Sequence, residues 1–266
     1  MSGIVKPLPG ICLYDEAGNE FKRNKRGICE MKIWQLLSNK ERLFNSTFYR
    51  HIPLYEKHKK LISYEAQFIF FIVPKSASTS LERMFRQQPE IEKIKLVRTP
   101  NVILQKKYDG YFKTAFVRNP WDRLVSAYKN KICNDRRELV EPFFVRYPQL
   151  SYKMAFDEFV EYVCSADGMD DKTDIHWKSQ HCFFSSGEKL LPNFIGKVEN
   201  LAGDYAEICK INNFTEVKLQ RVNASKTRTV ADLSKTYKQY YNAKTKKMIA
   251  NRYEKDIELF SYKFDE

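Results

Sequence analysis

The chain has 266 residues, 43% of them hydrophobic and 14% aromatic, which is enough apolar material for one large α/β domain and too much for a minimal module. Its 46 Lys and Arg residues exceed its 33 Asp and Glu residues, and the net charge of +13 predicts a polyanionic partner: a nucleotide, an acidic glycan, nucleic acid or an acidic membrane surface. The sequence has no stretch of about 18 apolar residues and no signal-peptide core, so we expect a cytoplasmic protein without a membrane span, or else the luminal part of an anchored enzyme.

The first 56 residues are basic and irregular, with turn signals at Pro9 and Gly10. We expect residues 1–56 to be an extension packed on a domain formed by residues 57–266. That domain opens with an apolar run at residues 66–73 (AQFIFFIV), which is typical of a strand buried on both faces. Pro74 ends the run, and a loop of small residues then leads into a helix on which Leu81 and Phe85 share one face.

The same strand, loop and helix unit recurs twice. Residues 111–117 (YFKTAFV) precede Pro120, which suits the first turn of a helix, and residues 193–198 (NFIGKV) precede a helix that runs to about Lys210. Alternating strands and helices predict a single α/β domain with a P-loop-type parallel sheet covered by helices on both faces. Ligands of such sheets bind at the carboxyl ends of the strands.

The loop after the first strand carries the strongest chemical signal. Its small residues allow successive backbone N–H groups to approach an anion, and the following helix directs its positive end toward the same place. A lysine adds charge, and hydroxyls add donors; the residues are Lys75, Ser76, Ala77, Ser78, Thr79 and Ser80. The alternative is an ordinary turn in which Thr79 and Glu82 form a capping box. The order of residues differs from a Walker A loop, which argues against ATP or GTP as the substrate.

A second constellation follows the second strand. Arg118 lies where that strand ends, and Ser126 lies on the next helix, away from its apolar stripe. Both side chains are suited to hold a second phosphate, Arg118 through paired hydrogen bonds. The alternative is a surface pair between Arg118 and Asp122, with Ser126 facing solvent.

These motifs resemble those of the sulfotransferases. VPKSASTS (residues 73–80) is similar to the 5′-phosphosulfate loop of the uronosyl 2-O-sulfotransferases. FVRNPWDRLVSAYKNK (116–131) resembles the 3′-phosphate motif of the Golgi carbohydrate sulfotransferases, which include the chondroitin and dermatan 4-O-enzymes. DIHWKSQ (174–180), FIGKVENL (194–201) and YEKDIELFSY (253–262) are similar to segments of the same group in the same order.

The resemblance implies an enzyme that moves a sulfuryl group from 3′-phosphoadenosine 5′-phosphosulfate to a hydroxyl of a carbohydrate or glycolipid. It implies that Lys75 stabilises charge on the bridging oxygen, that the loop from Ser76 to Ser80 holds the 5′-phosphate, and that Arg118 and Ser126 hold the 3′-phosphate. The segment RVNASKTRT (221–229) resembles a basic loop that closes over the nucleotide, and it supplies three further candidates: Lys226, Thr227 and Arg228. The alternative for this segment is a solvated basic loop.

A base is needed to take the proton of the acceptor hydroxyl. The first candidate is His176, which lies in the DIHWKSQ segment; His181, Glu90 and Glu92 remain alternatives. Glu82 is better suited to cap a helix. Six scattered cysteines lack metal-type spacing, so we expect reduced thiols and no metal.

Two other functions stay open from the residues alone. A P-loop kinase of a small molecule would use the same kind of loop, although Lys75 stands on the wrong side of the small residues for it. A non-catalytic polyanion-binding protein would explain the net charge, but the sequence has no recognisable nucleic-acid motif, so we expect no nucleic-acid partner. The sequence carries no signal for an oligomeric state.

Overall fold

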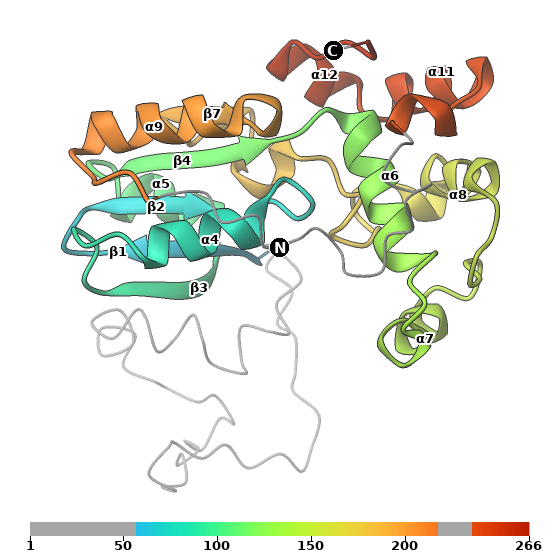
Figure 1. Ribbon diagram of the computed structural model, residues 1–266, viewed down its shortest axis with the longest axis horizontal. Coiled ribbons are helices and arrows are strands. Elements are labelled where there is room, and N and C mark those ends of the chain that lie inside the picture. Colours follow the sequence, from blue (N-terminus) through green and yellow to red (C-terminus); the bar gives the residue numbers. More distant parts are fainter. Residues whose placement is uncertain (1–56, 218–235, 266) are drawn as a thin grey trace, which may run out of the picture. The chain divides into compact units, whose positions relative to one another are not determined.

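The computed structural model describes residues 57–217 and 236–265, which lie in one compact unit (Figure 1). The expected extension of residues 1–56 and the three candidates Lys226, Thr227 and Arg228 lie outside the described residues. In the described part of the chain, no helix has the length and apolar character needed to cross a membrane.

A five-stranded sheet in the order β3-β1-β2-β4-β7 forms the centre of the domain. The strands β2 (Phe68–Phe71), β4 (Phe112–Val117) and β7 (Phe194–Lys197) are parallel, as the repeated strand and helix units predict. Strand β1 (Lys57–Ser63) pairs antiparallel with both β2 and β3 (Ile94–Pro100), so β1 runs against the other four strands of this sheet. The sheet is therefore mostly parallel but mixed, which confirms the predicted parallel sheet only in part.

Strand β1 escapes sequence detection because lysines interrupt its apolar pattern. Lys60 is nevertheless fully buried: its ammonium donates to the backbone oxygens of His58 (3.1 Å) and Thr99 (2.7 Å) and lies 5.6 Å from the centre of the Phe71 ring. Burial lowers the pKa of Lys60 to about 7.

Helices cover both faces of the sheet, as predicted (Figure 1). On one face, α4 (Ser78–Arg86) and α9 (Leu201–Asn212) pack against Phe68 and Phe70. On the other, α5 (Asn101–Lys107) and residues near α12 (Glu254–Phe260) pack against Ile69 and Phe71. This alternation along β2 explains why the whole strand is apolar.

A helical lobe lies beyond the carboxyl ends of the parallel strands (Figure 1). The helices α6 (Pro120–Lys131), α8 (Phe156–Val163) and α11 (Ala243–Arg252) build a second core around the fully buried Trp177. Asn119 caps α6 by accepting from the Trp121 N–H (3.1 Å), and Pro120 occupies the first turn as predicted. The remaining elements are α7 (Arg137–Arg146), β5 (Ser185–Ser186), β6 (Lys189–Leu190) and 3₁₀ turns at Ala166–Gly168, His181–Phe183, Val198–Asn200 and Tyr237–Tyr240.

Candidate active site

The loop between β2 and α4 has an unusual backbone. Lys75 (φ 68°) and Ala77 (φ 52°) both lie in the left-handed region, which non-glycine residues rarely adopt. Such residues turn neighbouring N–H groups toward one side and make a concave site for an anion. Within the described residues, the N–H groups of Ala77, Ser78 and Thr79 face no hydrogen-bond acceptor, so they are available to a ligand.

The alternative role for this loop, a capping box between Thr79 and Glu82, does not form. Ala77 is the N-cap residue of α4 and supplies no side-chain bond, and Glu82 instead pairs with Arg86 at 3.0 Å. Ser76 points inward: it is 1% exposed, and its hydroxyl donates to Oε1 of Gln180 at 3.1 Å. Thr79 is exposed, whereas the side chains of Ser78 and Ser80 are partly buried.

Arg118 follows the last residue of β4 and therefore emerges beside the loop. Its Nε and Nη2 atoms contact Oδ2 of Asp122 at 2.8 and 2.7 Å, and Nη1 donates to the Lys75 carbonyl at 3.3 Å. The surface pair considered from the sequence is thus present. A guanidinium has five N–H donors, so among the described residues these three contacts leave two donors for a ligand. Ser126 lies one turn beyond Asp122 on the same face of α6 and is partly buried.

His176 and Asp174 form a hydrogen-bonded pair. The Nδ1 atom of His176 contacts Oδ1 of Asp174, whose other carboxylate oxygen accepts from the Tyr147 hydroxyl at 3.4 Å. The contact with the carboxylate favours the neutral tautomer that carries its proton on Nδ1. Nε2 is then the ring nitrogen that is able to accept a proton. The His176 side chain is 22% exposed, so the ring is held in place and still accessible.

Burial lowers the pKa of His176 below its ordinary value; Asp174 opposes this shift, and the positive charges of Lys131 and Lys75 add to it. His176 is therefore neutral at pH 7. The backbone on either side is joined through Arg123, which donates from Nε to the Pro74 carbonyl (2.9 Å) and from Nη2 to the Ile175 carbonyl (3.4 Å), so the residues next to Lys75 and His176 are held by one side chain. Burial acts to raise the pKa of Asp174, but its bonds to His176 prevail, and the net shift is downward.

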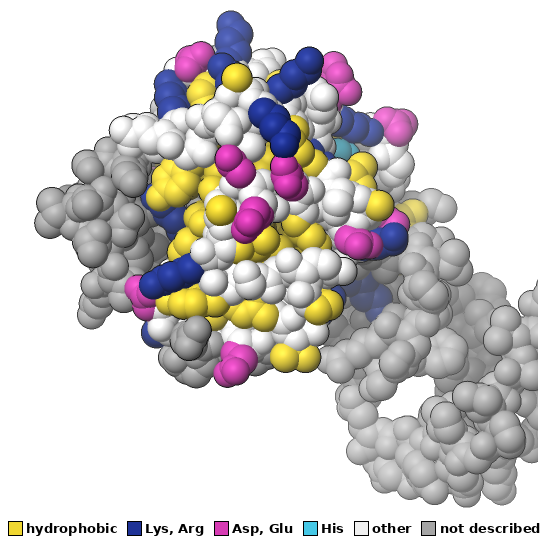
Figure 2. All heavy atoms as spheres, turned by 90° about the vertical axis from the view of Figure 1, so that its right-hand side faces the viewer, with side chains coloured by type: hydrophobic (Ala, Val, Ile, Leu, Met, Phe, Trp, Pro, Cys, Tyr) yellow, Lys and Arg dark blue, Asp and Glu magenta, His cyan; other side chains and the backbone are white. Residues whose placement is uncertain are grey.

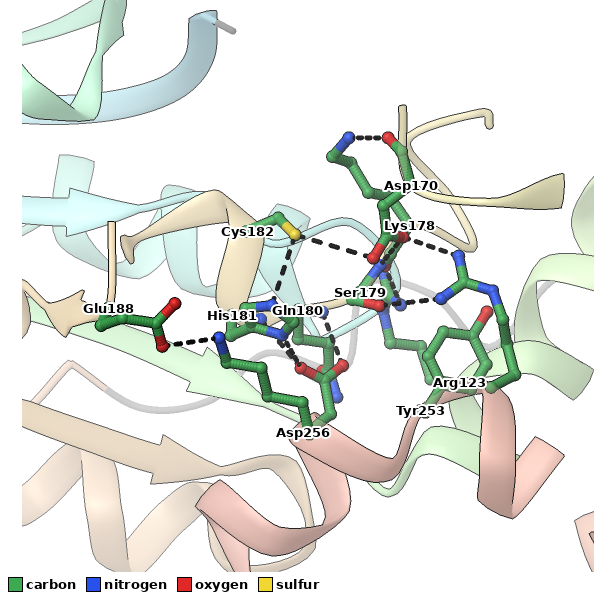
Figure 3. A network of polar contacts seen from close by, with 12 residues as sticks. Arg123, Asp170, Lys178, Ser179, Gln180, His181, Cys182, Glu188, Tyr253 and Asp256 are labelled. Carbon is green, nitrogen blue, oxygen red and sulfur yellow. Dashed lines mark hydrogen bonds and ion pairs between the residues drawn. The ribbon is translucent and has the colours of Figure 1, made fainter. Parts of the chain in front are cut away.

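The other candidate bases lie in different surroundings. His181 contacts Oδ1 of Asp256 through Nδ1 (2.7 Å) and lies 3.6 Å from the Cys182 sulfur through Nε2, so both ring nitrogens are engaged (Figure 3). Glu90 lies after the last residue of α4, at the end of this helix that is away from the loop. It accepts hydrogen bonds from the Thr215 N–H and hydroxyl at 3.0 and 2.6 Å. Glu92 is exposed beyond the same helix.

Arg123 is a buried residue that joins two segments of the site, a role that its sequence context does not reveal directly. It is 2% exposed and donates from Nε to the Pro74 carbonyl (2.9 Å) and from Nη1 to the Lys178 carbonyl (2.7 Å). It thereby fixes the start of the loop between β2 and α4 (residues 72–77, the candidate anion loop) against the segment that carries His176. The sequence indicates this role only through the position of Arg123: it is a charged residue on the side of α6 that is otherwise apolar, between Trp121 and Leu124.

Gln180 is the second such residue. Its Oε1 atom accepts from the Ser76 hydroxyl (3.1 Å) and the Arg118 N–H (2.9 Å), and its Nε2 atom donates to the Arg118 carbonyl (2.8 Å). The amide therefore joins the two expected phosphate sites. Its sequence signal is its place at the end of the DIHWKSQ segment.

The described residues contain neither a candidate metal site nor a disulfide. Residues 57–217 and 236–265 contain no group of three or more His, Cys, Asp or Glu side chains that could hold a metal ion. The four cysteines in this part of the chain form no disulfide: Cys133, Cys164, Cys182 and Cys209.

Comparison with known proteins gives consistent results. The model of the sulfotransferase family matches residues 58–263. Carbohydrate sulfotransferase 11 of Rattus norvegicus and the protein of the same name from Mus musculus are each 22% identical over 261 residues, which covers 85% of this chain and 71% of each relative. An uncharacterized protein of Archaeoglobus fulgidus is 27% identical over 127 residues, covering 47% of this chain and 87% of that protein. No solved structure matches the chain.

The residues matched by the family model include the anion loop, strand β4 with Arg118 directly after it, and the segment that carries His176. It extends well beyond half of the 266 residues. This chain is a sulfotransferase, a member of the sulfotransferase family.

Proposed function

We propose that this enzyme transfers a sulfuryl group from 3′-phosphoadenosine 5′-phosphosulfate to a hydroxyl of a carbohydrate, either free or in a glycolipid. The supporting observation is a set of hydrogen bonds that link three parts of the chain. Arg118 donates to the Lys75 carbonyl of the loop, and Arg123 donates to the carbonyls of Pro74, next to Lys75, and of Ile175, next to His176. The relatives from rat and mouse, each named carbohydrate sulfotransferase 11, support a carbohydrate acceptor.

The residues fit a donor with two separated anionic ends. The N–H groups of Ala77, Ser78 and Thr79, which have no acceptor within the described part of the chain, suit the 5′-phosphosulfate and make the loop a P-loop-type anion cradle. The two remaining N–H donors of Arg118 suit the 3′-phosphate, with the Asp122 carboxylate orienting the guanidinium. Ser126 remains a predicted ligand on the same helix face. Lys226, Thr227 and Arg228 remain predicted ligands from the sequence.

The proposed chemistry assigns one task to each side chain. The donor supplies the sulfuryl group, and a bond forms from the acceptor oxygen to sulfur while the bond from sulfur to the bridging oxygen breaks. His176 accepts the proton of the acceptor hydroxyl at Nε2, which its lowered pKa leaves free at pH 7. Lys75 stabilises the negative charge that develops on the bridging oxygen, and Asp174 stabilises the imidazolium.

The net charge of +13 belongs to the whole chain and does not by itself distinguish a donor site from a general polyanion-binding surface. On the face shown in Figure 2, Lys and Arg side chains are interspersed with Asp and Glu side chains and with hydrophobic ones, and they do not form a continuous basic patch. A nucleic-acid surface typically gathers its basic residues along one stripe. We propose that the site binds a small donor with two anionic ends. The expectation of no nucleic-acid partner stays a prediction from the sequence, which has no recognisable nucleic-acid motif.

A transfer assay with sulfur-labelled donor and a panel of glycans and glycolipids tests the proposal. We expect label to appear in at least one acceptor, and the Lys75→Ala variant to lower the rate about a hundredfold, as expected on loss of one electrostatic donor. Lys210→Ala is the matched control, since Lys210 is exposed on the last turn of α9, and its rate should be unchanged. Full activity of Lys75→Ala, or turnover of ATP with no transfer of label, would contradict the proposal.

A further inference from the structure

The side chain of Gln180 lies between the two proposed anion sites. It is fully buried, and each of its polar atoms is hydrogen-bonded: Oε1 accepts from the Ser76 hydroxyl and the Arg118 N–H, and Nε2 donates to the Arg118 carbonyl. Ser76 belongs to the loop after β2, whereas Arg118 belongs to the end of the neighbouring strand β4. One amide thus joins the loop that suits the 5′-phosphosulfate to the strand end that suits the 3′-phosphate.

A primary amide is well suited to this place. It accepts and donates at the same end, so it pairs with both the N–H and the C=O of Arg118 and still accepts from Ser76. No other neutral side chain of this length offers both functions. Because the site is buried, water cannot replace a lost bond without a change of structure, and the groups left unpaired destabilise the arrangement.

The backbone of Gln180 is fixed as well (Figure 3). Its N–H donates to Oδ2 of Asp256 at 2.6 Å, and Oδ1 of Asp256 accepts from the His181 N–H (3.0 Å) and contacts His181 Nδ1 (2.7 Å). Asp256 is fully buried on α12. A helix from a distant part of the sequence therefore holds the amide in one position, and the amide in turn holds the loop and the strand.

We propose that Gln180, anchored by Asp256, is a positioning residue that sets the separation of the two anion sites. The inference rests on the proposed function, because it assumes a donor that carries both phosphates. Two linked sites gain affinity for a two-ended ligand only when their separation matches the ligand. Loss of Gln180 should therefore weaken binding of a nucleotide that engages both sites, and should leave a nucleotide that engages one site almost unaffected.

The experiment measures the dissociation constants of adenosine 3′,5′-bisphosphate and adenosine 5′-monophosphate by calorimetry. In the Gln180→Met variant, which keeps the side-chain length, we expect the preference for the bisphosphate to fall about tenfold or more, with affinity for the monophosphate within about threefold. Gln88→Met is the matched control: Gln88 is 3% exposed and bonded to the Tyr205 hydroxyl, but it lies at the far end of α4. A similar loss of thermal stability with an unchanged preference is expected there.

An unchanged preference in Gln180→Met, or an equal loss for both nucleotides, would overturn the inference. If Gln180→Met does not fold, Ser76→Ala decides, because it removes one of the three bonds and keeps the amide. Its preference should fall about two- to fivefold, and an unchanged preference there would also overturn the inference. A wild-type protein that binds neither nucleotide would refute the proposed function itself, whereas a wild-type protein that prefers the bisphosphate while both variants retain that preference would refute only the role of Gln180.

Discussion

Replacement of Asp174 by Asn tests whether the His176–Asp174 pair takes the acceptor proton. The change keeps the size of the side chain and removes its charge. Asp174 normally raises the pKa of His176 against the effects of burial and of nearby lysines, so the variant should have a histidine of still lower pKa. The asparagine amide is also able to donate to Nδ1, which would move the ring proton to Nε2, where the base must be free.

The expected size of the effect follows from the contact that is lost. A hydrogen bond to a charged group contributes about 1.5–3 kcal/mol, which corresponds to a fall of about 10- to 150-fold in kcat/KM if that bond forms fully in the transition state. Loss of the correct tautomer would add to this figure, as it does in serine proteases, where the corresponding change lowers kcat by about 10⁴. We therefore expect a fall of at least about tenfold.

The assay is the pH dependence of kcat/KM for sulfuryl transfer, which reports the pKa values of the free enzyme. The wild-type rate should fall as the pH drops through the lowered pKa of His176, and in Asp174→Asn this acidic limb should move to lower pH. Asp171→Asn is the control, since Asp171 is exposed in the same segment. An unchanged plateau rate in Asp174→Asn, or an acidic limb that stays in place, would refute the assignment.

Three further predictions concern the same edge of the sheet. His176→Ala should lower transfer by about 10²–10⁴-fold and keep bisphosphate affinity within about twofold, and a large loss of affinity in calorimetry would show a structural role instead. Arg118→Ala should weaken donor binding by about 2–3 kcal/mol and remove the preference for 3′-phosphorylated nucleotides. Arg146→Ala, at an exposed arginine on the last turn of α7, should retain that preference. Ala77→Gly should leave the free energy of unfolding, measured with urea, unchanged or raise it by up to about 1 kcal/mol, because glycine adopts φ 52° without strain. A decrease of more than about 1 kcal/mol would argue against backbone strain at this position.

The pKa of His176 also predicts a stability effect. Because its folded-state pKa lies below the unfolded value of about 6.5, the unfolded chain binds more protons between those two values. Stability should therefore be unaffected by this group above pH 6.5 and should decrease as the pH falls below it. Urea denaturation of wild type and His176→Ala at pH 7 and at pH 5.5 would measure the difference.

The parts that are predictable from sequence are those with a continuous local pattern. The apolar run that contains Phe68–Phe71, the small-residue loop after it and Pro120 at a helix start each depend on near neighbours in the chain. Strand β1 is not predictable in this way, because Lys60 is a charged residue whose burial depends on carbonyl groups of two strands.

The linking residues of the site are hidden from sequence for a related reason. His176 can be named as a candidate from its motif, but its pairing with Asp174 two residues earlier depends on how the segment turns. Gln180 bonds to Ser76 across 104 residues, and Arg123 bonds to Lys178 across 55. No local period or spacing marks such contacts, because their partners are brought together by the fold.

The bond between Gln180 and Asp256 has a consequence for the order in which the protein folds. The anion loop lies between two elements that are close in sequence, so β2 and α4 are able to form early. The position of the anion loop relative to Arg118 depends on Gln180. The position of Gln180 in turn depends on Asp256, which lies 76 residues further along the chain. Contacts between distant residues form slowly because a long loop must close first. The two halves of the donor site should thus exist before they are correctly spaced, and affinity for the donor should develop only when α12 docks, late in folding.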